Sequence, residues 1–127
     1  MKKMILMSAM LLTTVVSFGR GRISENAKVV SDTIYYAANN LSVKNAQDAA
    51  YYRILKTQRS GMQKEDVFQD YYMNGNLRAE GGYSFIDLSN DKNTMLNGEV
   101  TTYYQNGKEK LHGTYVNGKR NGYFTLQ

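Results

Sequence analysis

Residues 102–115 read TYYQNGKEKLHGTY, and residues 70–83 read DYYMNGNLRAEGGY. The two stretches align without a gap at an offset of 32, with 6 identities in 14 positions, all of them Tyr, Asn or Gly. The unit Tyr-x-Asn-Gly occurs three times, beginning at Tyr72, Tyr104 and Tyr115. Self-similarity at a fixed spacing is typical of repeat proteins. We therefore expect residues 61–127 to form structural repeats.

Asn-Gly pairs divide this region into short runs. Such a pair between strand-forming runs is the strongest short signal for a β-hairpin, because a type I′ turn needs positive φ at both central residues. The intervening runs are rich in aromatic and β-branched residues, which favour strands. The predicted turns are Asn74-Gly75, Asn97-Gly98, Asn106-Gly107, Asn117-Gly118 and Asn121-Gly122. The predicted fold is all-β: a meander of antiparallel hairpins forming one elongated twisted sheet.

Glycines also stand inside the predicted strands, at Gly81, Gly82 and Gly113. In such places glycine marks either a bulge or a position where an aromatic ring lies over bare backbone.

Eight of the eleven tyrosines stand in adjacent pairs, at 35–36, 51–52, 71–72 and 103–104. Neighbouring residues of a strand point to opposite faces, so each pair should place one ring on either side of the sheet. One interpretation is structural stacking of rings. The other is an exposed aromatic face that binds glycan, peptide or lipid.

The N-terminal stretch 1–19, MKKMILMSAMLLTTVVSFG, has the charge and apolar run of a secretory signal peptide. Its apolar run is shorter than the ~20 residues of a membrane-spanning helix. An uncleaved anchor and a buried first helix are the alternatives. Loss of Lys2 and Lys3 on cleavage would lower the net charge from +5 to +3. We expect export to the periplasm or surface of a Gram-negative bacterium, with no transmembrane segment in the mature chain.

Residues 20–60 are predicted to form a leader or cap before the repeats. Runs at 29–30 and 33–36 read as strand, while 37–57 fits either strand or helix. We favour a strand over 49–57, because the Tyr-Tyr pair recurs there as it does in the repeats. Loops are expected over 58–64 and within 85–98.

Composition excludes several kinds of chemistry. The chain has no Cys, which rules out disulfides, thiolate metal sites and thiol catalysis. Its single histidine, His112, has no partner motif for catalysis. An acidic block over 61–100 separates two basic blocks, which argues against a nucleic-acid partner. We predict no enzyme activity and no cofactor.

Carboxylates suggest only weak alternatives. A glycosidase-like acid pair is not selected by any spacing. Residues 87–93 place oxygen side chains at every second position, as at the beginning of a calcium loop. Lys92 stands where that loop requires glycine, and Glu99 falls one position late, so no metal site is predicted.

The stretches YYMNGNLRAEGGY and NGEVTTYYQNGKEKLHGTYVNGKRNGY resemble the bacterial MORN-variant repeat. The resemblance covers about residues 67–127, and the leader is similar to that of exported Bacteroidetes proteins with such repeats. It implies hairpins that add side by side into one sheet, and a non-enzymatic interaction role. Some relatives are labelled as antitoxin components. The segment 86–96 stretches the repeat, and the last strand is expected to be an open edge that invites pairing with another chain.

The leading hypothesis is an exported, non-enzymatic protein that binds another protein or an envelope component. Pairing of its edge strand with another chain, or a homo-oligomer, is the expected form of assembly. The residues expected to make this contact are Tyr72, Tyr104, Tyr115, Lys108, Lys119 and Arg120. Aromatic contact and charge complementarity would be their roles. An antitoxin-like inhibitor and a small envelope glycan-binding or hydrolytic protein are the alternatives.

Overall fold

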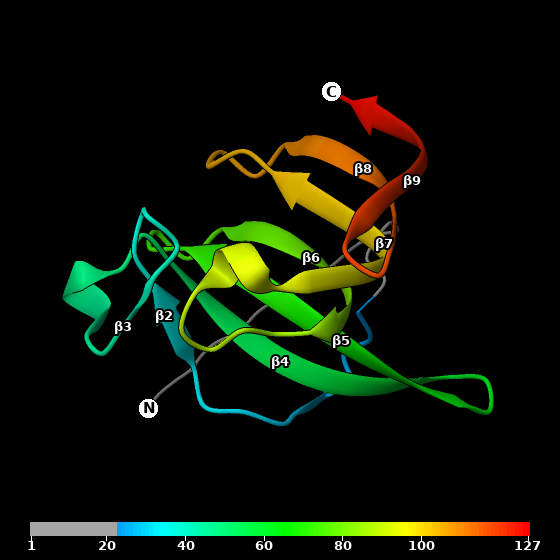
Figure 1. Cartoon of the computed structure of the whole chain (residues 1–127), viewed down its shortest axis with the longest axis horizontal. Coiled ribbons are helices and arrows are strands. Elements are labelled where there is room, and N and C mark those ends of the chain that lie inside the picture. The colour runs from blue at the N-terminus through cyan, green and yellow to red at the C-terminus, as the bar shows by residue number, and fades with distance from the viewer. Residues whose placement is uncertain (1–22) are drawn as a thin grey trace.

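The computed structural model describes residues 23–127, so the predicted signal peptide at 1–19 lies outside the described residues. Within this range the chain forms one antiparallel nine-stranded sheet in the order β3-β2-β4-β5-β6-β7-β8-β9, with β1 paired to β4 (Figure 1). The strands are β1 (Lys28–Val29), β2 (Ile34–Tyr36), β3 (Ser42–Val43), β4 (Tyr51–Ser60), β5 (Gln63–Tyr72), β6 (Leu77–Phe85), β7 (Met95–Tyr103), β8 (Glu109–Val116) and β9 (Lys119–Leu126). Two 3-10 turns, η3 (Ala46–Asp48) and η4 (Asp91–Asn93), complete the described elements. The predicted all-β meander of hairpins is confirmed.

The longest hairpin joins β4 and β5, which pair without interruption from Tyr51 opposite Tyr72 to Ser60 opposite Gln63. Gly61, with φ +67°, allows the tight turn between them. The strand predicted over 49–57 is therefore confirmed from Tyr51 onward, and the helical alternative is wrong there. The loop expected over 58–64 is wrong as well, because both strands continue into it.

Three of the five Asn-Gly pairs lie in hairpin connections as predicted, and one of the three has positive φ at both residues. The pairs 74–75 and 106–107 lie in matching loops, where Gly75 donates to the Tyr72 oxygen and Gly107 to the Tyr104 oxygen, each over 2.9 Å. The pair 117–118 is a two-residue turn between Val116 and Lys119, and both its residues have positive φ (48° and 87°). These angles identify a type I′ turn.

The other two pairs correct the prediction. Asn97-Gly98 lies inside β7 and Asn121-Gly122 lies inside β9, so neither is a hairpin turn. Each marks a bulge, where residues 97–99 stand opposite Gly82 and residues 122–124 stand opposite Gly113. Gly98 and Gly122 have φ of +91° and +75°. A bulge of this kind needs the same positive φ as a type I′ turn, so the sequence signal is shared.

The core lies on one face of the sheet, which we call the core face. It carries Leu55, Phe68, Ala79 and Val100, all buried. The segment between β6 and β7, with η4, crosses this face and adds Ile86 (Figure 1). This segment is anchored to the chain beside β3, since Ser42 donates to the Ser89 oxygen and Asp91 to the Asn40 oxygen. The long loop expected within 85–98 is confirmed: residues 86–94 form it and lie over the core as a lid, and β7 begins at Met95.

The strand glycines are sites of close approach. A Cβ at Gly113 would lie 2.5 Å from Cγ and Cδ2 of Phe124, whose ring covers the bare backbone. A Cβ at Gly81 would meet the Glu99 oxygen and Val100, and one at Gly82 would meet the Asn97 oxygen. The prediction of a ring over bare backbone is confirmed at Gly113.

Candidate functional site

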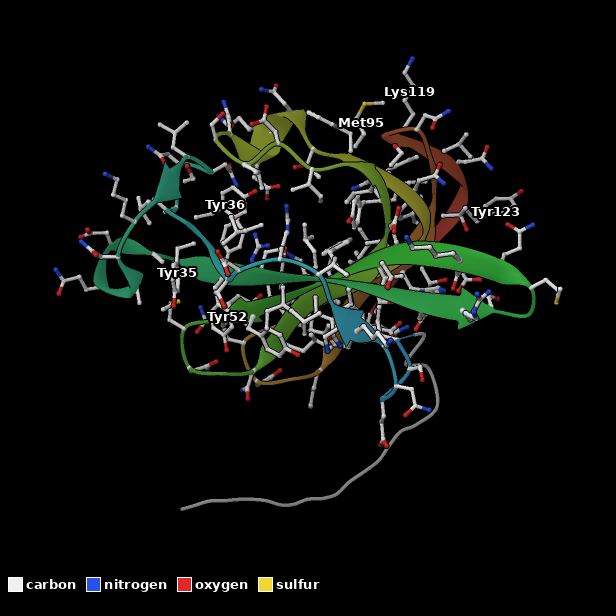
Figure 2. The ribbon with its side chains drawn as sticks, turned by 90° about the horizontal axis from the view of Figure 1, so that it is seen from below. Tyr35, Tyr36, Tyr52, Met95, Lys119 and Tyr123 are labelled. Atoms are coloured by element: carbon white, nitrogen blue, oxygen red, sulfur yellow. The ribbon has the colours of Figure 1, made fainter. Side chains whose placement is uncertain are left out.

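The paired tyrosines form ring stacks on both faces of the sheet. The outer face, opposite the core face, carries a row of three rings, from Tyr35, Tyr52 and Tyr71. Neighbouring ring centroids in this row are 6.2 Å and 5.2 Å apart. Tyr36 and Tyr51 stack on the core face at 5.3 Å. Figure 2 shows Tyr36 on one side of the ribbon and Tyr35 and Tyr52 on the other. Because neighbouring rings pack against one another across the strands, these contacts favour the stacking interpretation.

Two of the predicted contact tyrosines join strands that are not direct neighbours in the sheet. The Tyr72 hydroxyl donates to the Tyr103 main-chain oxygen over 2.6 Å. The Tyr104 hydroxyl makes the matching bond to the Gln127 oxygen over 3.4 Å. Tyr72 and Tyr104 therefore each reach the end of the next but one strand. Tyr104 is 41% exposed, so it retains surface for a partner.

The third predicted tyrosine belongs to the core. Tyr115 packs against the core residues and meets the edge of Phe124 at 5.4 Å, with the rings nearly perpendicular. Arg120 adds a cation–π contact, since its guanidinium carbon lies 4.8 Å from the Phe124 centroid. Tyr115 is thus placed to pack rather than to contact a partner.

The six predicted contact residues do not form one surface. Tyr104 and Lys108 line an open pocket of about 430 Å³ beside the β7–β8 turn. Lys119 and Arg120 lie at the β8–β9 turn, at the other end of the eight-residue strand β8. Eight residues of strand span about 26 Å. One compact ligand cannot touch both groups.

A charged cluster that the sequence analysis missed lies within the core face. Arg53 binds Asp70 in a bidentate manner, with Nε to Oδ1 at 2.7 Å and Nη2 to Oδ2 at 2.8 Å. It also donates to Asp91 of η4 over 2.6 Å and 3.1 Å. Arg53 and Asp70 are 3% and 1% exposed. The cluster therefore joins β4, β5 and the lid.

Aromatic rings surround this cluster. The Arg53 guanidinium lies 5.1 Å from the centroids of both Tyr36 and Phe68. Arg78 stacks over Tyr51 at 3.8 Å and reaches Asp70 at 3.4 Å. Such contacts add cation–π attraction to the ion pairs.

Burial and ion pairing have opposing effects on the pKa of each of these groups. Burial raises the pKa of Asp70, against the opposing effect of Arg53. Burial also acts to raise the pKa of Asp91, but hydrogen bonds and charge from Arg53 outweigh it and the pKa is lowered. Burial disfavours the charge on Arg53, yet the two carboxylates hold its pKa above the ordinary value.

A cavity of about 180 Å³ lies over the cluster, with Arg53, Arg78, Asp91 and Tyr115 among its lining residues. Each oxygen of Asp70 accepts from Arg53, and each oxygen of Asp91 accepts from Arg53, with Tyr51 adding a 2.6 Å bond to Asp91. Both carboxylates are thus engaged by donors from the protein. We interpret the cluster as a structural tie. Its sequence signal is charged residues at core-facing positions, as in the alternation Tyr51, Arg53, Leu55.

The loop considered as a calcium loop is organised by its own donors. The Asp87 carboxylate accepts from the main-chain nitrogens of Ser89 and Asn90, the Ser89 hydroxyl and the Asn93 amide. These bonds hold the Asp87 pKa well below its usual range. Asp91 turns toward Arg53 instead. No group of three or more metal-ligating residues occurs within residues 23–127.

His112 lies in a polar row on the outer face. Its Nδ1 is 2.7 Å from the Thr101 hydroxyl, and its Nε2 is 3.8 Å from Glu99. Beside it, Tyr103 donates to Glu80 over 2.9 Å. The row is made of cross-strand neighbours, so it supports sheet register.

The most exposed aromatic surface lies on β9, the last strand of the order. Tyr123 is 100% exposed and points away from the molecule (Figure 2), and Leu126 is 70% exposed. No other strand of the described part of the chain pairs with the outer edge of β9. This edge and its exposed side chains form the candidate interface.

No protein family, curated protein or solved structure matches this chain. Residues 23–127 contain no helix long and apolar enough to cross a membrane.

Proposed function

We propose that the chain is an exported, non-enzymatic β-repeat protein that binds another protein through the outer edge of β9. The observation that carries this proposal is Tyr123, a large aromatic side chain that is fully exposed on an edge strand. Tyr is enriched at protein interfaces, because its ring is apolar while its hydroxyl bonds water or a partner.

An edge strand also offers unpaired main-chain groups. A partner segment that adds as a further strand gains main-chain hydrogen bonds for affinity and alternate side-chain contacts for specificity. On β9 those contacts would include Tyr123 and Leu126, with Lys119 and Arg120 adding positive charge at one end. Tyr104 and Lys108 line a pocket together with Gln127, the residue that follows β9.

The repeat and the export signal belong to the same proposal. The hairpins β5–β6 and β7–β8 carry matching Tyr-x-Asn-Gly loops, which supports a MORN-variant repeat. A processed chain beginning near Arg20, found in the periplasm or at the cell surface, is the expected outcome of fractionation. A cytoplasmic, unprocessed chain would favour an antitoxin-like inhibitor instead.

The binding proposal is tested by replacing Tyr123 with a photo-crosslinking residue in the protein expressed in the bacterium that produces it. We expect a crosslinked product to form from position 123. The matched control is position 62, where Met62 is 94% exposed at the β4–β5 turn, far from β9. The same products from both positions, or none from position 123, would contradict an interface at β9.

A further inference from the structure

We infer that the outer edge of β9 pairs with β9 of a second copy of this chain, antiparallel and centred on Tyr123. This rests on the proposed interface at β9 and names its partner. The sheet itself shows how a strand of this type accepts a neighbour.

Strand β7 is the structural counterpart of β9. Thr101 of β7 pairs with Glu80, and Thr125 of β9 pairs with His112, the residue at the matching position of β8. Both strands carry an Asn-Gly bulge on the side of the preceding strand. On its outer edge, β7 nevertheless holds β8 in continuous register from Gly98 to Thr102. A bulge of this kind therefore does not block a further strand at the edge.

The β7–β8 pairing shows what the neighbour must carry. Gly113 lies opposite Val100, and Tyr115 lies opposite Gly98. A neighbouring strand with the pattern Gly-x-aromatic thus places its glycine opposite the large side chain of β7. Its aromatic ring then lies opposite the glycine of β7. On β9 the corresponding positions are Gly122 and Phe124.

Strand β9 has the same pattern in its own sequence, Gly122-Tyr123-Phe124. In an antiparallel pairing centred on Tyr123, Phe124 of each copy lies opposite Gly122 of the other. Each copy then supplies the glycine opposite Phe124 and the ring opposite Gly122 that the other copy needs.

The charges of β9 permit this pairing. In the same register, Lys119 and Arg120 lie opposite Gln127 and Leu126 of the second copy, so no like charges stand directly opposite. The contact is two-fold symmetric and closes at two chains. The edge strands at the other end, β1 and β3, have two residues each and offer much less pairing.

The first test is the mass of the purified protein in solution, measured by light scattering and sedimentation over a range of concentrations. We expect a reversible dimer. Tyr123→Lys places two positive charges at the symmetry axis and should weaken the dimer at least ~10-fold, because like charges directly opposite are unfavourable. The side chain is fully exposed, so the fold should be retained. Met62→Lys, at an equally open position, should leave the dimer unchanged.

A second variant tests the register. The chain has no Cys, so Tyr123→Cys introduces a single thiol that meets its own copy at the symmetry axis. Directly opposed strand residues are close enough to form a disulfide. We expect rapid oxidation to a covalent dimer, and much slower dimer formation by Met62→Cys.

The outcomes separate this inference from the proposed function. The self-pairing is overturned if the protein is a monomer at all concentrations, or if Tyr123→Lys does not weaken the dimer. If the protein is a monomer and position 123 still crosslinks to a different protein, binding at β9 stands and the partner is another chain. If neither a dimer nor a crosslink forms, both proposals fail.

Discussion

The Tyr72 hydroxyl donates to the Tyr103 main-chain oxygen across 2.6 Å, and this bond ties the β5–β6 turn to the end of β7. The counterpart from Tyr104 to Gln127 is longer, at 3.4 Å, and more exposed. The primary role of these two tyrosines is therefore to hold the sheet together within the chain.

Removing the Tyr72 hydroxyl should lower stability. We expect Tyr72→Phe to reduce the free energy of unfolding by about 1 kcal/mol, since a hydrogen bond is lost and the Tyr103 oxygen is left without this donor. Denaturant unfolding measures the change. Tyr104→Phe is the matched control, and its loss should be smaller. A larger loss for Tyr104→Phe would contradict this ranking.

Breaking the buried cluster should cost much more. Arg53→Met leaves Asp70 and Asp91 without their main cation, so we expect a loss of about 3–5 kcal/mol in the free energy of unfolding. Adding Asp70→Leu should recover part of this loss, because one uncompensated buried charge is removed. Arg59→Met changes an exposed arginine of the same strand and should cost little. If Arg53→Met costs no more than Arg59→Met, the cluster is not a structural tie.

Gly113 should not tolerate a side chain. In Gly113→Ala the new Cβ would press on the Phe124 ring, and overpacking of this kind costs about 1–3 kcal/mol. Thermal unfolding should show a lowered midpoint. Combining it with Phe124→Ala tests the cause, because the double variant should lose less than the sum of the two single changes. Additive losses would show that the ring does not set the requirement for glycine.

Stability should fall at alkaline pH. Burial raises the pKa of Tyr36 and that of Tyr71 to about 12, above the ordinary value of 10.0. The unfolded chain then loses these protons at lower pH than the folded chain. Stability from these groups is complete below pH 10 and is lost as the pH rises toward 12, by up to about 1.4 kcal/mol per pH unit for each tyrosine.

Denaturant unfolding between pH 8 and pH 12 measures this loss. Tyr36→Phe should flatten the pH dependence, since one of the shifted groups is removed. A curve that keeps its full slope in Tyr36→Phe would assign the loss to other groups.

Local signals predicted most of the sheet. Asn-Gly pairs and Tyr-rich runs located the β5–β6, β7–β8 and β8–β9 hairpins, because the conformation of a short turn depends mainly on its own residues. The same signals could not separate a turn from a bulge. Asn97-Gly98 and Asn121-Gly122 satisfy the same φ requirement within a strand, and only pairing with the neighbouring strand decides between the two.

The buried cluster could not be predicted because its members are distant in sequence. Arg53 and Asp70 are 17 positions apart, and Arg53 and Asp91 are 38 apart. Each alone is an ordinary charged residue. Only the register of β4 on β5, and the path of the lid over the core, brings them together.

From β4 to β9 every strand pairs with the strand that follows it in the chain. Contacts between sequence neighbours close short loops, so the entropy lost at each step of folding is small. We expect folding to begin at the ten-pair β4–β5 hairpin and the sheet to grow from it one hairpin at a time toward the C-terminus. Amide hydrogen exchange should accordingly be slowest in β4 and β5 and fastest in β9, whose outer edge stays unprotected unless a partner covers it.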